Sequence, residues 1–145
     1  MVISNFNSKI VFLDTAPLIY FIEGHSDYQD VLLKLFDLNE KGDFFFIASS
    51  ITLLEVLVKP LREDKHDIGR QYRNILTQSP GIEVFDITPS TSEIAAGFRA
   101  KYNIRTPDSI QLATSIEGGA NYFLTNDNRL KLISELNVVN IGELR

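Results

Sequence analysis

Short apolar runs alternate with amphipathic segments along the whole chain. The runs at 9–13, 44–48, 82–85, 122–124 and 138–139 have the length of strands, and the run at 44–48 is apolar on both faces. Strands buried in a parallel sheet show this continuous apolar pattern, because helices cover them on both sides. The alternation therefore predicts an α/β fold with a central parallel sheet of about five strands, flanked by helices on both faces.

The segments between these runs carry helical periodicity and recognisable ends. We predict helices over 15–22, 27–41, 50–58, 65–78, 90–102, 106–117 and 126–134. Lys59 and Pro60 are expected to end the third of them. Thr106 is expected to cap the sixth, with Pro107 at its first position and Asp108 in its first turn.

Length and composition narrow the class of protein. The 145 residues contain no repeat and no linker, so we expect a single domain over 1–145. The absence of cysteine excludes disulfides, thiolate metal sites and cysteine nucleophiles. No secretory signal and no apolar run of membrane-spanning length occur, so a cytoplasmic location without membrane contact is expected. The net charge of −5 argues against binding nucleic acid through a broad basic face.

Four acidic residues stand near one edge of the predicted sheet. Asp14 directly follows the first strand, and Asp127 follows the fourth by three residues. Glu55 lies in the helix after the second strand, and Asp108 opens the helix before the fourth. Sites in open parallel sheets form at the carboxyl ends of the strands. We therefore predict that these four carboxylates converge there.

Each acid also has a structural interpretation. Asp14 is placed to cap the helix that begins near Thr15, and Asp108 and Asp127 to interact with a helix dipole. Glu55 completes a capping-box pattern with Thr52 unless Ser49 or Ser50 caps that helix. From 51 to 58 only Thr52 and Glu55 are polar, so we expect this helix to be buried nearly all round. An unpaired carboxylate there would need a partner such as a cation.

The donor set indicates which ion would be bound. Clustered carboxylates without nearby cysteine or histidine favour Mg²⁺ or Mn²⁺ over Zn²⁺. Both histidines, His25 and His66, are expected to be solvated rather than metal ligands. The chain has no glycine-rich phosphate loop, no G-x-S-x-G nucleophile motif and no Asp-x-Asp pair at position 14, so other phosphoryl and hydrolase chemistries lack support.

Four segments together resemble the motifs of VapC-type PIN-domain toxins. They are LDTAPLIYFIEGH at 13–25, SSITLLEV at 49–56, RTPDSIQLAT at 105–114 and FLTND at 123–127, in the family's order and over nearly the whole chain. The resemblance implies a five-stranded parallel sheet and a metal-dependent ribonuclease site. It also implies the toxin of a toxin–antitoxin pair, usually a homodimer that is inhibited by a small cognate antitoxin.

On this hypothesis the chain cuts RNA phosphodiester bonds with a metal-activated water. Asp14 and Asp108 would hold the main Mg²⁺ or Mn²⁺, Asp127 would complete the site, and Glu55 would position the water or act as general base. The hydroxyls of Thr15 and Thr125 would orient ligands or water, or else cap helices. Two sets of basic residues are candidates for RNA contact. The nearer set in sequence is Arg99, Lys101, Arg105 and Arg129; the other is Lys59, Arg62, Lys65, Arg70 and Arg73, equally well read as a solvated helix surface.

Two other classes of function remain open from the sequence. One is a PIN-domain nuclease that acts in RNA processing or on DNA. The other is a non-catalytic interaction domain whose acids only cap helices.

Overall fold

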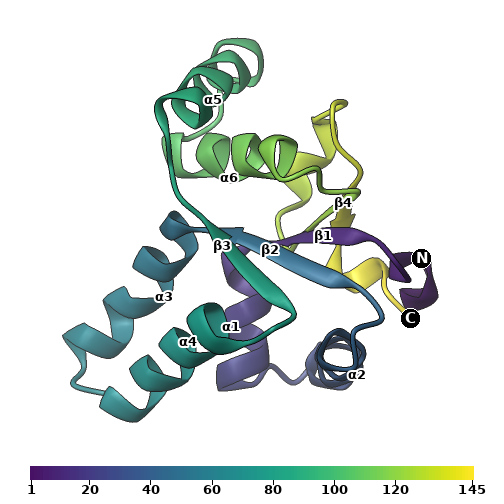
Figure 1. Ribbon diagram of the computed structural model, residues 1–145, viewed down its shortest axis with the longest axis vertical. Coiled ribbons are helices and arrows are strands. Elements are labelled where there is room, and N and C mark those ends of the chain that lie inside the picture. The colour runs from purple at the N-terminus through teal and green to yellow at the C-terminus, as the bar shows by residue number, and fades with distance from the viewer.

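A computed structural model describes residues 1–145, and its centre is a five-stranded, wholly parallel sheet with the order β3-β2-β1-β4-β5 (Figure 1). The strands are β1 (Ile10–Leu13), β2 (Phe45–Ser49), β3 (Ile82–Phe85), β4 (Tyr122–Thr125) and β5 (Val138–Asn140). The predicted α/β class, the parallel sheet and its five strands are confirmed.

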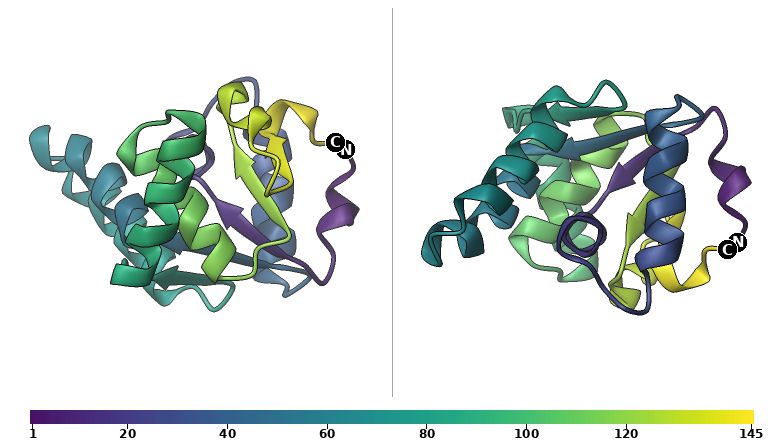
Figure 2. Two further views of the ribbon diagram at one scale, coloured as in Figure 1. Left: turned by 90° about the horizontal axis from the view of Figure 1, so that it is seen from above. Right: turned by 90° about the horizontal axis from the view of Figure 1, so that it is seen from below.

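Helices cover both faces of the sheet (Figures 1 and 2). One face carries α1 (Thr15–Glu23), α2 (Gln29–Glu40), α3 (Ser50–Arg62) and α4 (His66–Gln78). The other carries α5 (Pro89–Tyr102) and α6 (Thr106–Glu117). Three short 3₁₀ helices complete the chain: η1 (Ile3–Phe6), η2 (Asn128–Leu132) and η3 (Ile141–Glu143).

Alternate strand residues build two separate hydrophobic cores. On β1, Val11 and Leu13 face the α1–α4 layer, and Phe12 faces the α5–α6 layer. Phe12 stacks on Phe123 of β4 with ring centroids 4.9 Å apart, and Leu112 of α6 packs in the same core. This alternation is the period-two geometry of a strand applied to a sheet that is covered twice.

The strand order creates a switch point between β1 and β4. From β1 the chain builds outward through β2 to β3, then crosses through α5 and α6 on the opposite face to β4. Ligand sites in open α/β sheets form where the order reverses, outside the carboxyl ends of the strands. Asp14 follows β1 at that point.

Three local predictions were wrong. α3 does not end at Lys59 and Pro60 but runs to Arg62, because proline removes only one helical hydrogen bond and Pro60 is buried beside Gly69 of α4. The predicted helix over 126–134 is only the 3₁₀ turn η2. Phe45 is 53% exposed, so β2 is not apolar on two buried faces at its start.

The helix that carries Glu55 is also less buried than its sequence indicates. Leu54, Val58 and Leu61 are each more than 40% exposed and lie at i, i+4 and i+7, on one face of α3. The apolar residues that predicted full burial therefore form an uncovered stripe. None of the helices combines the length and hydrophobicity that a membrane span requires.

Candidate active site

Asp14 is fixed at the switch point by two hydrogen bonds. It caps α1, with Oδ1 accepting from the backbone N–H of Thr15 at 2.9 Å. Its Oδ2 accepts from the hydroxyl of Thr125, at the end of β4, at 2.8 Å. The parallel pairing of Leu13 with Leu124 brings these residues together. The capping role is real, and it leaves the carboxylate in one defined orientation.

Asp14 resists ionisation in this setting. Burial raises its pKa to about 6, and the negative charges of Asp108 and Glu55 add to the increase. The hydrogen bonds from Thr125 and Thr15 oppose the shift without cancelling it. A carboxyl group with this pKa gains from a cation placed beside it, because the cation offsets both the lost hydration and the like charges.

Glu55 points back to the start of α1. The hydroxyl of Thr15 donates to Glu55 Oε1 at 2.7 Å. Glu55 takes no part in capping its own helix, because Ser49 does so by accepting from the N–H of Ile51 at 3.1 Å. Thr15 and Thr125 therefore each orient a carboxylate, and neither is the cap of α1.

Asp108 stands in the first turn of α6 and pairs with Arg105. The Nε of Arg105 lies 3.2 Å from Asp108 Oδ2. The predicted threonine cap was wrong by one residue: Arg105 occupies the cap position without a side-chain capping bond, and Thr106 is the first helical residue. The helix dipole supports the negative charge of Asp108 at this end.

Asp127 caps η2 and pairs with Arg129. Its Oδ1 accepts from the backbone N–H of Arg129 at 3.0 Å, and its Oδ2 lies 2.7 Å from Nη2 of the same residue. The hydrogen bond from the Arg129 side chain holds the pKa of Asp127 below its usual value, and Arg105 contributes to the decrease. Asp127 therefore differs from Asp14: it carries its charge readily.

The four acids share one edge of the sheet, but they do not form a closed cluster. Asp108 and Glu55 act electrostatically on Asp14, whereas Asp127 lies in the field of Arg105 and Arg129. No group of three or more Asp, Glu, His or Cys side chains lies close enough together to hold a metal ion.

Gln111 of α6 is a buried residue of this region that the sequence did not single out. Its Oε1 accepts from Ser49 at 2.5 Å, and its Nε2 donates to Thr52 at 2.8 Å. All three side chains are at most 2% exposed. Asp108 and Gln111 lie three residues apart on α6, as Thr52 and Glu55 do on α3. The hydrogen bond between Gln111 and Thr52 therefore joins α6 and α3 one turn from Asp108 and one turn from Glu55.

The basic residues that are candidates for RNA contact are unequally engaged. Arg105 and Arg129 pair with Asp108 and Asp127, and Lys101 pairs with Glu135. Arg99 only donates from Nε to the carbonyl oxygen of Ile104 at 2.9 Å. The two histidines hold no acid of the site. His66 is exposed, and the half-buried His25 packs against Tyr20 and Tyr28.

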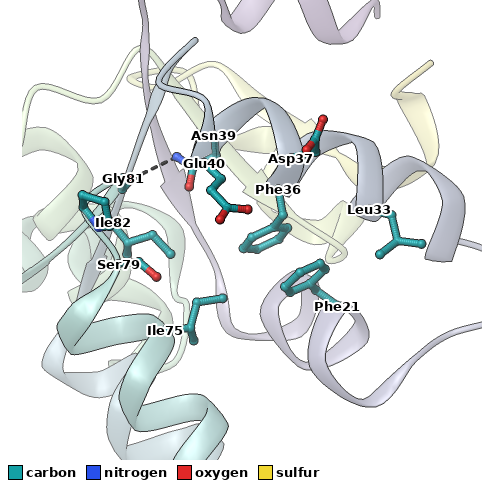
Figure 3. A pocket seen from close by; sticks show the side chains of 11 residues that line it. Phe21, Leu33, Phe36, Asp37, Asn39, Glu40, Ile75, Ser79, Gly81 and Ile82 are labelled. Atoms are coloured by element: carbon teal, nitrogen blue, oxygen red, sulfur yellow. Dashed lines mark hydrogen bonds between the residues drawn. The ribbon is translucent and has the colours of Figure 1, made fainter.

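A separate hollow lies away from these acids. A cavity of about 500 Å³ lies at the opposite edge of the sheet, between α1, α2 and the segment from α4 to β3 (Figure 3). Phe21 and Phe36 stack in its wall with centroids 3.8 Å apart, Leu33 is exposed beside them, and Asp37 and Glu40 line it. Apolar walls with two carboxylates suit a protein segment better than a phosphate.

Known proteins share this architecture. The family model of the PIN domain matches residues 11–136. Among solved structures, VapBC2 from Rickettsia felis, bound to a DNA fragment from its promoter, has a TM-score of 0.72 and 20% identity over 90% of this chain and 98% of that one. A toxin–antitoxin complex from Klebsiella pneumoniae has a TM-score of 0.66 and 21% identity over 91% and 97%.

DNA-bound VapBC from Salmonella typhimurium has a TM-score of 0.66 and 18% identity over 92% of this chain and 98% of that one. At such identities the likeness to these structures establishes the fold alone. A comparison with curated proteins finds no match.

Proposed function

The chain belongs to the PIN-domain family, a family of nucleases, and from that premise we propose that it is a Mg²⁺- or Mn²⁺-dependent endoribonuclease and the toxin of a toxin–antitoxin pair. The observation that carries the catalytic proposal is the position of Asp14 together with its raised pKa. It stands at the switch point of the sheet with two other carboxylates acting on it, and its pKa is raised to about 6.

The types of donor at this edge suit a hard divalent cation, although no three of these side chains lie close enough together in the metal-free chain to hold one. Asp14 and Asp108 supply carboxylate oxygens from opposite layers of the fold, and Asp127 supplies more from the loop after β4. No cysteine is present, and neither histidine pairs with these acids, so the donor set is all oxygen. Arg105 and Arg129 supply positive charge to Asp108 and Asp127 in the metal-free chain, and a bound cation would take over part of that role.

The roles follow from the hydrogen bonds. Asp14 and Asp108 would hold the cation, and Asp127 would complete its surroundings. When bound, the cation supplies a more acidic water and neutralises charge on the phosphate. Thr15 occupies Glu55 Oε1, so Glu55 Oε2 is left to accept a proton from the attacking water. Attack on phosphorus with departure of the 3′ oxygen leaves a 5′-phosphate and a 3′-hydroxyl.

RNA is the proposed substrate because the chain resembles VapC-type toxins in four ordered segments. DNA cleavage and RNA processing are the alternatives within the same chemistry. A genomic neighbour that encodes a small DNA-binding protein would favour the toxin, and its absence would favour processing. A cytoplasmic location is proposed on the same grounds.

The proposed protein partner is a small antitoxin. Two observations support it. The similar solved structure from Klebsiella pneumoniae is described as a toxin–antitoxin complex. The cavity of Figure 3 has apolar walls that suit a partner's side chains and two carboxylates that suit a basic residue. A homodimer is proposed as well. The exposed stripe of Leu54, Val58 and Leu61 supports it, because apolar side chains in a row on a helix are covered in most stable proteins.

The decisive experiment is cleavage of single-stranded RNA by the purified chain with Mg²⁺ or Mn²⁺, with EDTA, and by Asp14→Asn. Asp30→Asn is a matched control, since Asp30 is an exposed acid on α2. We expect cleavage by the wild type and by Asp30→Asn with metal, and none with EDTA or by Asp14→Asn. Equal cleavage by wild type and Asp14→Asn would reject catalysis at this edge. A non-catalytic interaction domain would then be the remaining interpretation of these acids.

A further inference from the structure

A hollow between α5 and α6 differs from other hollows of the surface in its charge. Its volume is about 400 Å³, and it is lined by Arg99, by the hydroxyl side chains of Ser92 and Thr106, and by small or aliphatic groups. Ser109 also lines it, but this residue is buried and its hydroxyl donates to the carbonyl oxygen of Thr106. We call it the α5–α6 groove. Four other hollows each include a carboxylate: Asp37 and Glu40 in one, Glu135 in two, and Asp64 with Asp67 in the fourth.

The α5–α6 groove is therefore lined by a cation without an acid, on a chain whose net charge is −5. Its cation is also available. Arg105 and Arg129 are paired with acids, whereas Arg99 has no ion pair within the chain and uses only its Nε, toward the carbonyl oxygen of Ile104 at 2.9 Å. That bond orients the guanidinium and leaves both terminal nitrogens free to donate.

The groove also adjoins the proposed reaction site. Thr106, the first residue of α6, lines it, and Asp108 follows two residues later in the same turn, on another face of the helix. An RNA strand that has its scissile phosphate at Asp108 and continues across this first turn would bring a neighbouring phosphate to the groove. Guanidinium and hydroxyl donors are the groups that proteins most often direct at phosphate oxygens.

We propose that the α5–α6 groove binds a phosphodiester of the RNA strand next to the one that is cleaved, with Arg99 as its cation. The inference rests on the proposed nuclease function and extends it. Because this contact is the same before and during the reaction, it contributes to binding of the strand and not to the chemical step.

The test compares Arg99→Gln and Arg99→Lys with Lys34→Gln. Lys34 is exposed and unpaired on α2, so its substitution removes one positive charge from the opposite face of the sheet. Cleavage of a single-stranded RNA oligonucleotide gives kcat and KM with Mn²⁺. Fluorescence anisotropy of the same RNA in EDTA, across a series of KCl concentrations, gives the salt dependence of binding. Circular dichroism confirms that each variant folds.

We expect Arg99→Gln to raise KM about tenfold with kcat nearly unchanged, and to reduce the slope of log K against log salt by about 0.7, the value for one phosphate on a single strand. Arg99→Lys should keep the slope, and Lys34→Gln should match the wild type. If the wild type cleaves RNA and Arg99→Gln has the same KM and the same salt slope, this inference is overturned and the proposed function is not. A fall in kcat without a change in slope overturns it too. A wild type that neither binds nor cleaves RNA overturns the inference together with the proposed function.

Discussion

Thr125 donates a hydrogen bond to Asp14 across 2.8 Å, although 111 positions separate the two residues in the chain. The bond joins the ends of β1 and β4, where the strand order reverses, and it lowers the pKa of Asp14 against the effect of burial. It is the only side-chain hydrogen bond among the causes of that pKa, so Thr125 partly controls how readily Asp14 becomes a metal ligand.

Thr125→Val should therefore raise the pKa of Asp14 above about 6 and weaken Mn²⁺ binding about 10- to 100-fold, as the loss of a hydrogen bond to a ligand commonly does. Thr125→Ser keeps the hydroxyl and should retain most of the affinity. NMR titration of the Asp14 carboxyl carbon in EDTA measures the pKa, and calorimetry measures Mn²⁺ affinity. Equal affinity in the valine and serine variants would contradict this prediction.

Asp14 should make the metal-free protein less stable at neutral pH. Its pKa of about 6 in the folded chain lies above the ordinary value of 3.8, so the folded state binds the proton more tightly. The resulting stabilisation is full below pH 3.8 and is lost as the pH rises through about 6, up to about 3 kcal/mol in all. In EDTA at pH 7.5, Asp14→Asn should unfold at a higher urea concentration than the wild type, because asparagine still caps α1.

A bound metal ion should offset the loss of stability that the ionised Asp14 causes. Mn²⁺ should raise the urea midpoint of the wild type at pH 7.5 and have little effect at pH 5, where a proton occupies Asp14. It should not stabilise Asp14→Asn at either pH. Urea titrations at both pH values, with Mn²⁺ and with EDTA, check these expectations together; equal stabilisation of both chains would show that the ion binds elsewhere.

Gln111 should fix the position of α6 relative to α3. Gln111→Met fills the same space but leaves the buried hydroxyls of Ser49 and Thr52 without that partner, at a cost of about 1–3 kcal/mol. Because Asp108 is carried on α6, we also expect Mn²⁺ affinity to fall about tenfold. Thr114→Val is the control: Thr114 is equally buried on α6 but bonds only to Ile110 of its own helix, so it should lower stability without changing Mn²⁺ affinity.

The stripe on α3 should hold two copies of the chain together. Leu54→Glu with Leu61→Glu places charge on that face and should convert the protein to a monomer in light-scattering measurements, with little effect on folding. Val2→Glu, at a residue of similar exposure at the start of the chain, should leave the mass unchanged. A wild type that is already monomeric at micromolar concentration would reject the dimer proposal.

Strands and their ends could be predicted because buried parallel strands are apolar on both faces, as Val11, Phe12 and Leu13 are. That pattern was enough to place Asp14 and Asp127 at one edge. Helix ends were less predictable where packing decided them. Pro60 predicts the end of a helix, yet α3 continues to Arg62 because Pro60 packs beside Gly69 of α4. Which basic group meets which acid was not predictable either, since the pairing of Arg105 with Asp108 depends on the rotamers of two flexible side chains.

Gln111 was missed for a different reason. A single glutamine in a helix gives no signal of its partners, and Ser49 lies 62 residues away on another element. A weaker signal was available: from 109 to 115 α6 is buried at nearly every position, although four of those residues are polar. Buried polar residues in a helix need partners, and Gln111 has one of its two on α3, the helix that carries Glu55.

Because the interior is divided into two cores, this protein can lose activity without losing its fold. Asp14 and Glu55 are attached to the layer of α1–α4, whereas Asp108 is attached to the layer of α5 and α6, and the sheet lies between them. A small displacement of one layer would separate the acids while both interiors stay packed. Variants in the interior of α5 are thus expected to include chains that fold, resist proteolysis and persist at full abundance, yet have lost their activity.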